Sequence, residues 1–91
     1  MPTMTVWPKV EETRIAQALQ QVGEKLDSAG GDVVLDFSSV HKVDTSAVRA
    51  MEELARIAAE KSVKIVLHGV KVDVHKVLIL SRLKSRFSFV S

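Results

Sequence analysis

The chain has 91 residues, of which 46% are hydrophobic and 26% are charged, and its formal net charge at pH 7 is +2. This length suits one small domain with one hydrophobic core, so we expect residues 1–91 to form a single domain. The absence of cysteine excludes a disulfide framework, a thiol nucleophile and thiolate metal sites. The apolar runs are short, and no signal-peptide pattern stands at the N-terminus, so we expect a cytoplasmic protein without a membrane-inserted segment.

The first half of the chain predicts a strand, an amphipathic helix and a second strand. Residues 4–7 predict a short strand that stops at Pro8. Residues 11–27 carry apolar side chains at helical spacing: these are Ile15, Ala18, Leu19, Val22 and Leu26. Residues 32–38 form a nearly continuous apolar run, which is typical of a strand that is covered on both faces.

The second half continues the alternation of helices and strands. Residues 46–61 predict a long helix, residues 63–69 a buried strand, residues 72–83 a helix and residues 87–90 a last short strand. Strands that alternate with helices imply an α/β domain with a mostly parallel four-stranded sheet and right-handed connections. In such sheets, functional groups gather beyond the carboxyl ends of the strands.

The long helix opens on acid and hydroxyl side chains, Asp44, Thr45 and Ser46. One interpretation is structural, because these residue types cap helix N-termini. The other interpretation is regulatory, because the unpaired N–H groups of a helix N-terminus accommodate an anion such as a phosphate on Ser46. Arg49 lies one turn further along the same helix, within reach of a phosphate oxygen.

The ordered segments "VVLDFSSV", "KVDTSAV", "VKIVLHGV", "VHKVLILSRL" and "RF" cover residues 33–87. This set resembles the STAS domain, the fold shared by bacterial anti-sigma factor antagonists and the cytoplasmic tails of sulfate transporters. The chain departs from the family in two places. Ala47, Val48 and Arg49 replace the usual Gly-Leu-Gly, and only residues 4–7 remain of the usual N-terminal hairpin.

The resemblance implies a non-enzymatic regulatory module that binds an anti-sigma factor, which in this family can also be the kinase. Carried over by position, Ser46 is the phosphoacceptor. The implied partner-binding residues are His41, Asp44, Thr45, Ser46, Ala47, Val48 and Arg49. Asp36, at the end of a strand, has a structural role instead, because its carboxylate can satisfy backbone donors in the loop that contains Ser38 and Ser39.

Two other functions remain open. The chain could be the STAS subunit of an ABC-type phospholipid transporter, whose motif V-D-T/S-G-G-L is close to "VDTSAV"; the helix face would then make constitutive contacts. It could also be an orphan homodimeric module, because a short N-terminus leaves a sheet edge to be paired and Trp7 offers apolar area to an interface.

Catalytic, metal and nucleic-acid sites are not expected. His41, His68 and His75 are dispersed, without the spacing of a metal site, and no G-x-S-x-G motif accompanies Ser46. No cofactor-binding loop is present either, since Gly30 and Gly31 precede a strand instead of following one. The basic cluster at Arg82, Lys84 and Arg86 is interpreted as a solvated surface beside a helix end, and not as a nucleic-acid patch.

Overall fold

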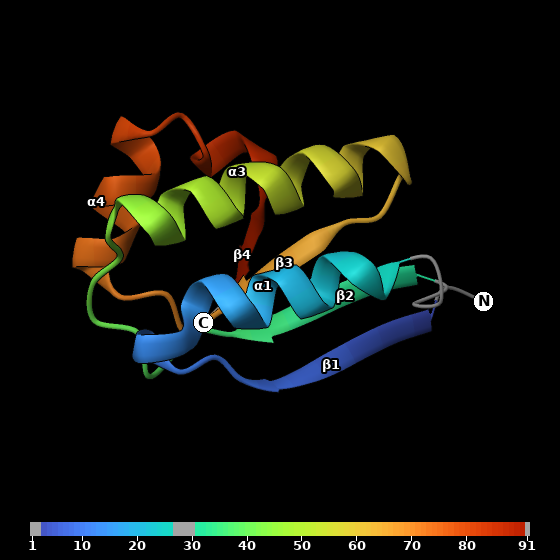
Figure 1. The fold of residues 1–91 in the computed structure, drawn as a ribbon, viewed down its shortest axis with the longest axis horizontal. Helices are drawn as coiled ribbons and strands as arrows, with labels where there is room; N and C mark the ends of the chain where they lie inside the picture. The colour runs from blue at the N-terminus through green and yellow to red at the C-terminus, as the bar shows by residue number, and fades with distance from the viewer. Residues whose placement is uncertain (1–2, 27–30, 91) are drawn as a thin grey trace.

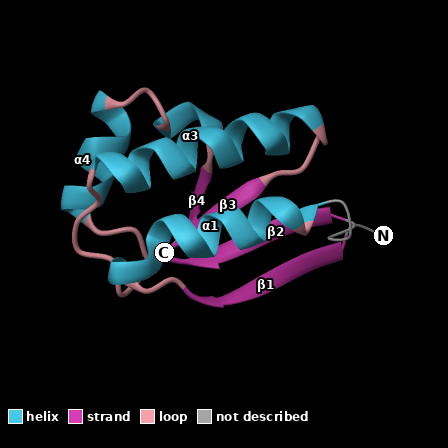
Figure 2. Ribbon diagram, in the orientation of Figure 1, coloured by secondary structure: helices cyan, strands magenta, loops and turns pink. Residues whose placement is uncertain are grey.

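A computed structural model of the protein describes residues 3–26 and 31–90. Strands and helices alternate along the chain as the sequence predicts (Figure 1 and Figure 2). In chain order the elements are β1 (Thr3–Lys9), the 3₁₀ turn η1 (Glu12–Arg14), α1 (Ile15–Glu24), β2 (Gly31–Asp36), α3 (Thr45–Glu60), β3 (Ile65–His68), α4 (Val72–Leu80), the 3₁₀ turn η2 (Lys84–Arg86) and β4 (Ser88–Val90). The predicted end of the first helix, at residue 27, lies outside the described residues.

The four strands form one parallel sheet in the order β1-β2-β3-β4, which confirms the predicted α/β fold class. Each new strand is added on the same side of the preceding one. With right-handed crossovers this order places every connecting helix on the same face of the sheet, as Figure 1 shows for α1, α3 and α4.

The one-sided arrangement corrects the expectation that residues 32–38 are covered on both faces. In β2 the side chains of Val33 and Leu35 point into the core and are fully buried, whereas Val34 between them is only half-buried. The core forms between the sheet and the helices, where Leu19 of α1 and Leu54 of α3 pack with the two buried residues of β2. Val66 of β3 is buried but does not belong to this core cluster.

The N-terminal strand is longer than predicted. It continues through Pro8 to Lys9, and its pairing with β2 shifts register between Val6 and Lys9. A proline lacks the N–H donor that regular strand pairing needs, so β1 can contain Pro8 because the pairing is irregular at this point. Residues 3–9 therefore cover the edge of β2, which a shortened N-terminus was expected to leave exposed.

Trp7 of β1 is partly buried and packs against the core. The ammonium group of Lys25 lies 5.8 Å from the centre of the indole ring. The indole Nε1 is buried and has no hydrogen-bond partner among the described residues. Part of the apolar area of Trp7 is thus used within the monomer.

Gly69 brings two loops together at the carboxyl end of the sheet. Its φ of +71° lies in the left-handed region, and a Cβ atom placed on it would lie 2.9 Å from the Cβ of Ser38. Its N–H donates to the carbonyl of Val90 at 3.1 Å. The loop after β2 and the turn after β3 can approach this closely because no side chain separates them.

Candidate functional site

The N-terminus of α3 is capped by Asp44. This residue has an extended backbone, with φ −95° and ψ −177°, and its Oδ1 accepts a hydrogen bond from the Ala47 N–H at 2.8 Å. Such a side-chain cap is worth about 1 kcal/mol. The structural role that the sequence offered for residues 44–46 therefore belongs to Asp44.

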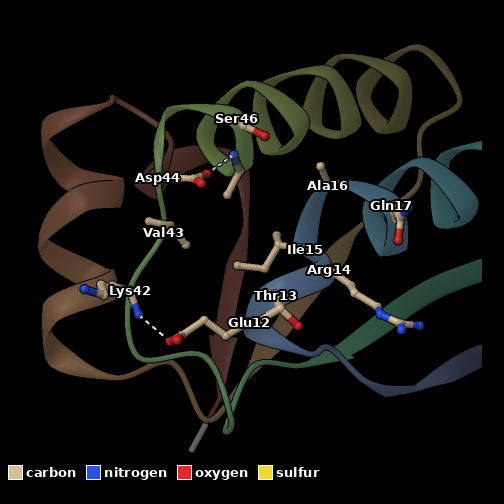
Figure 3. Close-up of a pocket in the computed structure, with 11 residues that line it drawn as sticks. Glu12, Thr13, Arg14, Ile15, Ala16, Gln17, Lys42, Val43, Asp44 and Ser46 are labelled. Carbon is tan, nitrogen blue, oxygen red and sulfur yellow. Dashed lines mark hydrogen bonds between the residues drawn. The ribbon is translucent and has the colours of Figure 1, made fainter.

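Ser46 lies in the first turn of α3 and is exposed. Figure 3 shows its hydroxyl pointing away from Asp44. Among the described residues, no hydrogen bond engages this hydroxyl, so it has no structural partner to lose. The hydroxyl stands beside the N–H groups of a helix N-terminus, where the positive end of the helix dipole favours an anion.

Ser46 borders an open groove of about 640 Å³ between the start of α1 and the N-terminus of α3 (Figure 3). The lining residues come from the η1–α1 segment, from the loop before α3 and from the first turn of α3: they are Glu12, Thr13, Arg14, Ile15, Ala16, Gln17, Lys42, Val43, Asp44, Ser46 and Ala47. The groove combines apolar side chains with both signs of charge. This mixture suits contact with a protein surface better than the enclosed binding of a small molecule.

Glu12 ties the loop before α3 to the start of α1, and the sequence gives no sign of this role. Its Oε1 accepts hydrogen bonds from the N–H of His41 at 2.6 Å and of Lys42 at 3.0 Å, across about thirty residues of chain. Those two bonds, with the one from His41 contributing most, hold the pKa of Glu12 below its usual value. The partners are backbone groups, so no residue type in the loop reveals them.

We predict that Glu12→Gln loosens this loop at neutral pH. A carboxylate with a lowered pKa stabilises the folded state above its unfolded pKa of about 4.3, and this contribution is lost as the pH falls through the lower folded pKa. In the wild type, the amide ¹H shifts of His41 and Lys42 should therefore titrate in acid. In the variant, the same amide shifts should at pH 7 already equal those of the wild type in acid, and they should not change as the pH falls. Wild-type shifts that stay constant through this range would contradict the tether.

Asp36 organises the turn that follows β2. Its Oδ1 accepts hydrogen bonds from the Ser38 hydroxyl at 2.6 Å and from the Ser38 N–H at 2.9 Å. The hydroxyl bond first, and then the backbone bond, lower the pKa of the Asp36 carboxyl. His68 lies beside it in β3, with its Nδ1 3.8 Å from the same carboxylate oxygen.

The structure separates the predicted partner-binding residues into distinct environments. Asp44, Ser46 and Ala47 line the groove, although Ala47 itself is only 3% exposed. Val48 is half-buried and packs against the core, while Thr45 is exposed at the helix start. His41 is exposed, and its backbone N–H is held by Glu12. Arg49 is exposed but lines a different groove, on the outer side of α3.

Within residues 3–26 and 31–90, no group of three or more His, Cys, Asp or Glu side chains could hold a metal ion. No helix in the same ranges is long and apolar enough to span a bilayer.

Solved structures with the same fold include three proteins of related description. A candidate anti-sigma factor antagonist from Thermotoga maritima, TM1081, superposes with a TM-score of 0.72 at 15% identity, over 100% of this chain and 75% of its own. A serine-to-glutamate variant of RsbS from Moorella thermoacetica gives 0.74 at 25% identity, over 99% and 83%. A chain from a stressosome, described as a signal integration and transduction hub, gives 0.69 at 25% identity, over 94% and 77%.

Comparison with curated proteins gives no significant match. A protein-family model described as "Mlab, STAS domain" matches residues 12–90, which is nearly the whole chain and includes the capped helix, Ser46 and the groove. The resemblance that the ordered segments indicate is thereby confirmed. This chain belongs to the STAS domain family.

Proposed function

We propose that this protein is a non-enzymatic, cytoplasmic regulatory module that binds a protein partner in the manner of an anti-sigma factor antagonist. The partner docks around the N-terminus of α3, on the groove that Ser46 borders. The observation that carries the proposal is the exposed, unengaged hydroxyl of Ser46 beside a helix N-terminus that Asp44 already caps. The similar folds of RsbS and of the stressosome chain support a role in protein association and signalling.

Phosphorylation of Ser46 is the proposed control. A phosphate would add nearly two negative charges to the rim of the groove. The N–H groups of the first turn of α3 can accommodate these charges, whereas the neighbouring Asp44 carboxylate repels them. The helix is capped through Asp44 and Ala47, so the added charge changes the docking surface without removing a contact that holds the fold.

The test is to map phosphate on the protein isolated from its native cells. We expect tandem mass spectrometry to find one phosphate, located on Ser46, and to find none on the Ser46→Ala variant expressed in the same cells. Phosphate located on another residue, or none on Ser46 under conditions where the partner is released, would contradict control at this position.

The transporter-subunit function remains the second candidate, and the start of α3 is the observation that favours it. Asp44 and Thr45 reproduce the beginning of the transporter-subunit motif, and the exposed Ser46 hydroxyl can serve as a permanent contact without modification. Under this candidate Ser46→Ala should weaken partner binding. Under the antagonist proposal the alanine variant should bind the partner as well as the wild type does. It should also stay bound under conditions where phosphorylation of Ser46 releases the wild type.

We further propose that β1 contributes to a homodimer, because one edge of this strand has no partner strand among the described residues. Val6 of β1 is 71% exposed, so Val6→Lys should place a charge beside that edge and shift the protein toward monomer in light scattering at micromolar concentration. Val72, on α4, is 70% exposed and provides the matched control, since Val72→Lys should leave the dimer intact. A wild type that is strictly monomeric would contradict the proposal.

A further inference from the structure

A second groove, of about 410 Å³, runs between the outer side of α3 and the connection from α4 to β4. Four arginines line it, Arg49, Arg56, Arg82 and Arg86, together with Glu52 and Glu53. We call this surface the arginine groove. It joins residues that are far apart in the sequence, and its α3 side begins one turn after Ser46.

The arginines of the groove are not equivalent. Arg56 is paired with Glu53 and also with Glu60, at 2.6 Å from the second carboxylate. By contrast, no hydrogen bond or ion pair is found between the described residues and the guanidinium groups of Arg49, Arg82 and Arg86. Glu52 and Glu53 are the carboxylates in the lining, and Glu53 is already engaged by Arg56. The groove therefore presents an excess of guanidinium groups that are available to an external anion.

Arg82 occupies a backbone position where glycine would be more stable. Its φ is +60°, in the left-handed conformation that follows the end of α4. The helix ends through hydrogen bonds from Arg82 N–H to the Ile79 carbonyl, at 3.1 Å, and from Leu83 N–H to the Leu78 carbonyl, at 2.8 Å. Glycine is the usual residue in this position. An arginine in a conformation that carries this cost suggests a use for its side chain.

The segment that carries Arg82 and Arg86 is anchored at two points. Leu83 is 4% exposed and Phe87 is 7% exposed, and both belong to the core. The N–H of Arg86 donates to the Leu83 carbonyl at 3.0 Å, which closes the turn between the two anchors. The two arginines therefore project from a fixed turn, which reduces the entropy lost when they bind a ligand.

We propose that the arginine groove receives an acidic segment of the protein partner that docks at Ser46. The inference rests on the proposed function, because that docking places the partner over Arg49 at the α3 end of the groove. Guanidinium groups bind carboxylates through paired, charge-assisted hydrogen bonds. A phosphate on Ser46 would repel the same acidic segment, so the groove explains why a charge change at Ser46 can release the partner.

A protein segment suits the groove better than nucleic acid does. The chain as a whole has a formal net charge of only +2. Beyond the groove, Glu60 stands on the exposed face of α3, where it is paired with Arg56. A continuous phosphate backbone along this face would meet that carboxylate, whereas a short acidic peptide ends before it.

The test titrates the whole protein, unmodified at Ser46, into a fluorescein-labelled oligoglutamate peptide at low ionic strength, with anisotropy as the readout. Arg82→Gly should weaken binding roughly three- to fivefold, the effect of one exposed ion pair, while keeping or raising the melting temperature. Ser62→Gly is the backbone control, because Ser62 has a φ of +55° after α3 and does not line the groove; it should bind like the wild type.

A second pair of variants separates the groove from general charge. Arg86→Gln should weaken the peptide roughly three- to fivefold, whereas Lys64→Gln, which removes an exposed charge away from the groove, should not. Losses that are equal in both variants would overturn the proposal. Tighter binding of oligothymidylate of the same charge, or of phosphatidylserine vesicles, would also overturn it. These outcomes leave the Ser46 proposal untouched, because the titration involves neither a phosphate nor the native partner.

Discussion

Replacing Gly69 with alanine should lower the free energy of unfolding by about 2–4 kcal/mol. Two costs combine at this position. An L-residue at φ +71° adopts a left-handed conformation, which costs roughly 1–2 kcal/mol. The new methyl group would also lie 2.9 Å from the Cβ of Ser38, with the Ser38 Cα at 3.2 Å. Because these are atoms at and next to the backbone, a side-chain rotation cannot relieve the contact.

Urea unfolding of the variant beside the wild type measures this loss. Gly23→Ala is the matched control, since its Cβ would meet the flexible end of Ile57 at 3.3 Å and the helical backbone of α1 accepts an alanine. The control should stay within about 1 kcal/mol of the wild type, because alanine raises helix propensity while the contact costs a similar amount. A Gly69→Ala variant as stable as the control would contradict the close approach of the two loops.

The periodicity of the sequence is sufficient to predict most of the fold. Apolar spacing identifies α1 and α3, and the order of strands and helices implies the parallel sheet. The spacing does not show that all helices lie on one face, because this follows from the spatial order of the strands. Nor does it show that β1 continues past Pro8, because a register shift in the pairing with β2 accommodates the proline.

The candidate site is only partly visible in the sequence. Asp44 and Ser46 can be found because a cap and its helix are neighbours in the chain. Glu12 cannot be found in this way, because it binds backbone N–H groups of a distant loop. The arginine groove is an intermediate case: Arg82 and Arg86 form a visible basic cluster, but only folding places Arg49 beside them.

The second large effect is expected from Ser46→Asp, which should weaken partner binding by at least about tenfold while leaving the fold intact. An acidic side chain near a helix N-terminus is tolerated, and Ser46 makes no hydrogen bond with the described residues that the change would remove. We therefore expect a change in unfolding free energy of no more than about 0.5 kcal/mol. Asparagine has nearly the same shape as aspartate but carries no charge, so Ser46→Asn should bind the partner like the wild type.

Control at Ser46 is tested most directly by capture of the native partner from one cell lysate, with the wild type, Ser46→Asn and Ser46→Asp compared side by side. The melting temperature of each variant is recorded alongside. We expect one protein that the wild type and the asparagine variant capture equally and that the folded aspartate variant does not capture. A partner captured equally by all three would contradict control at Ser46, and so would an aspartate variant that loses its partner only because it is unfolded.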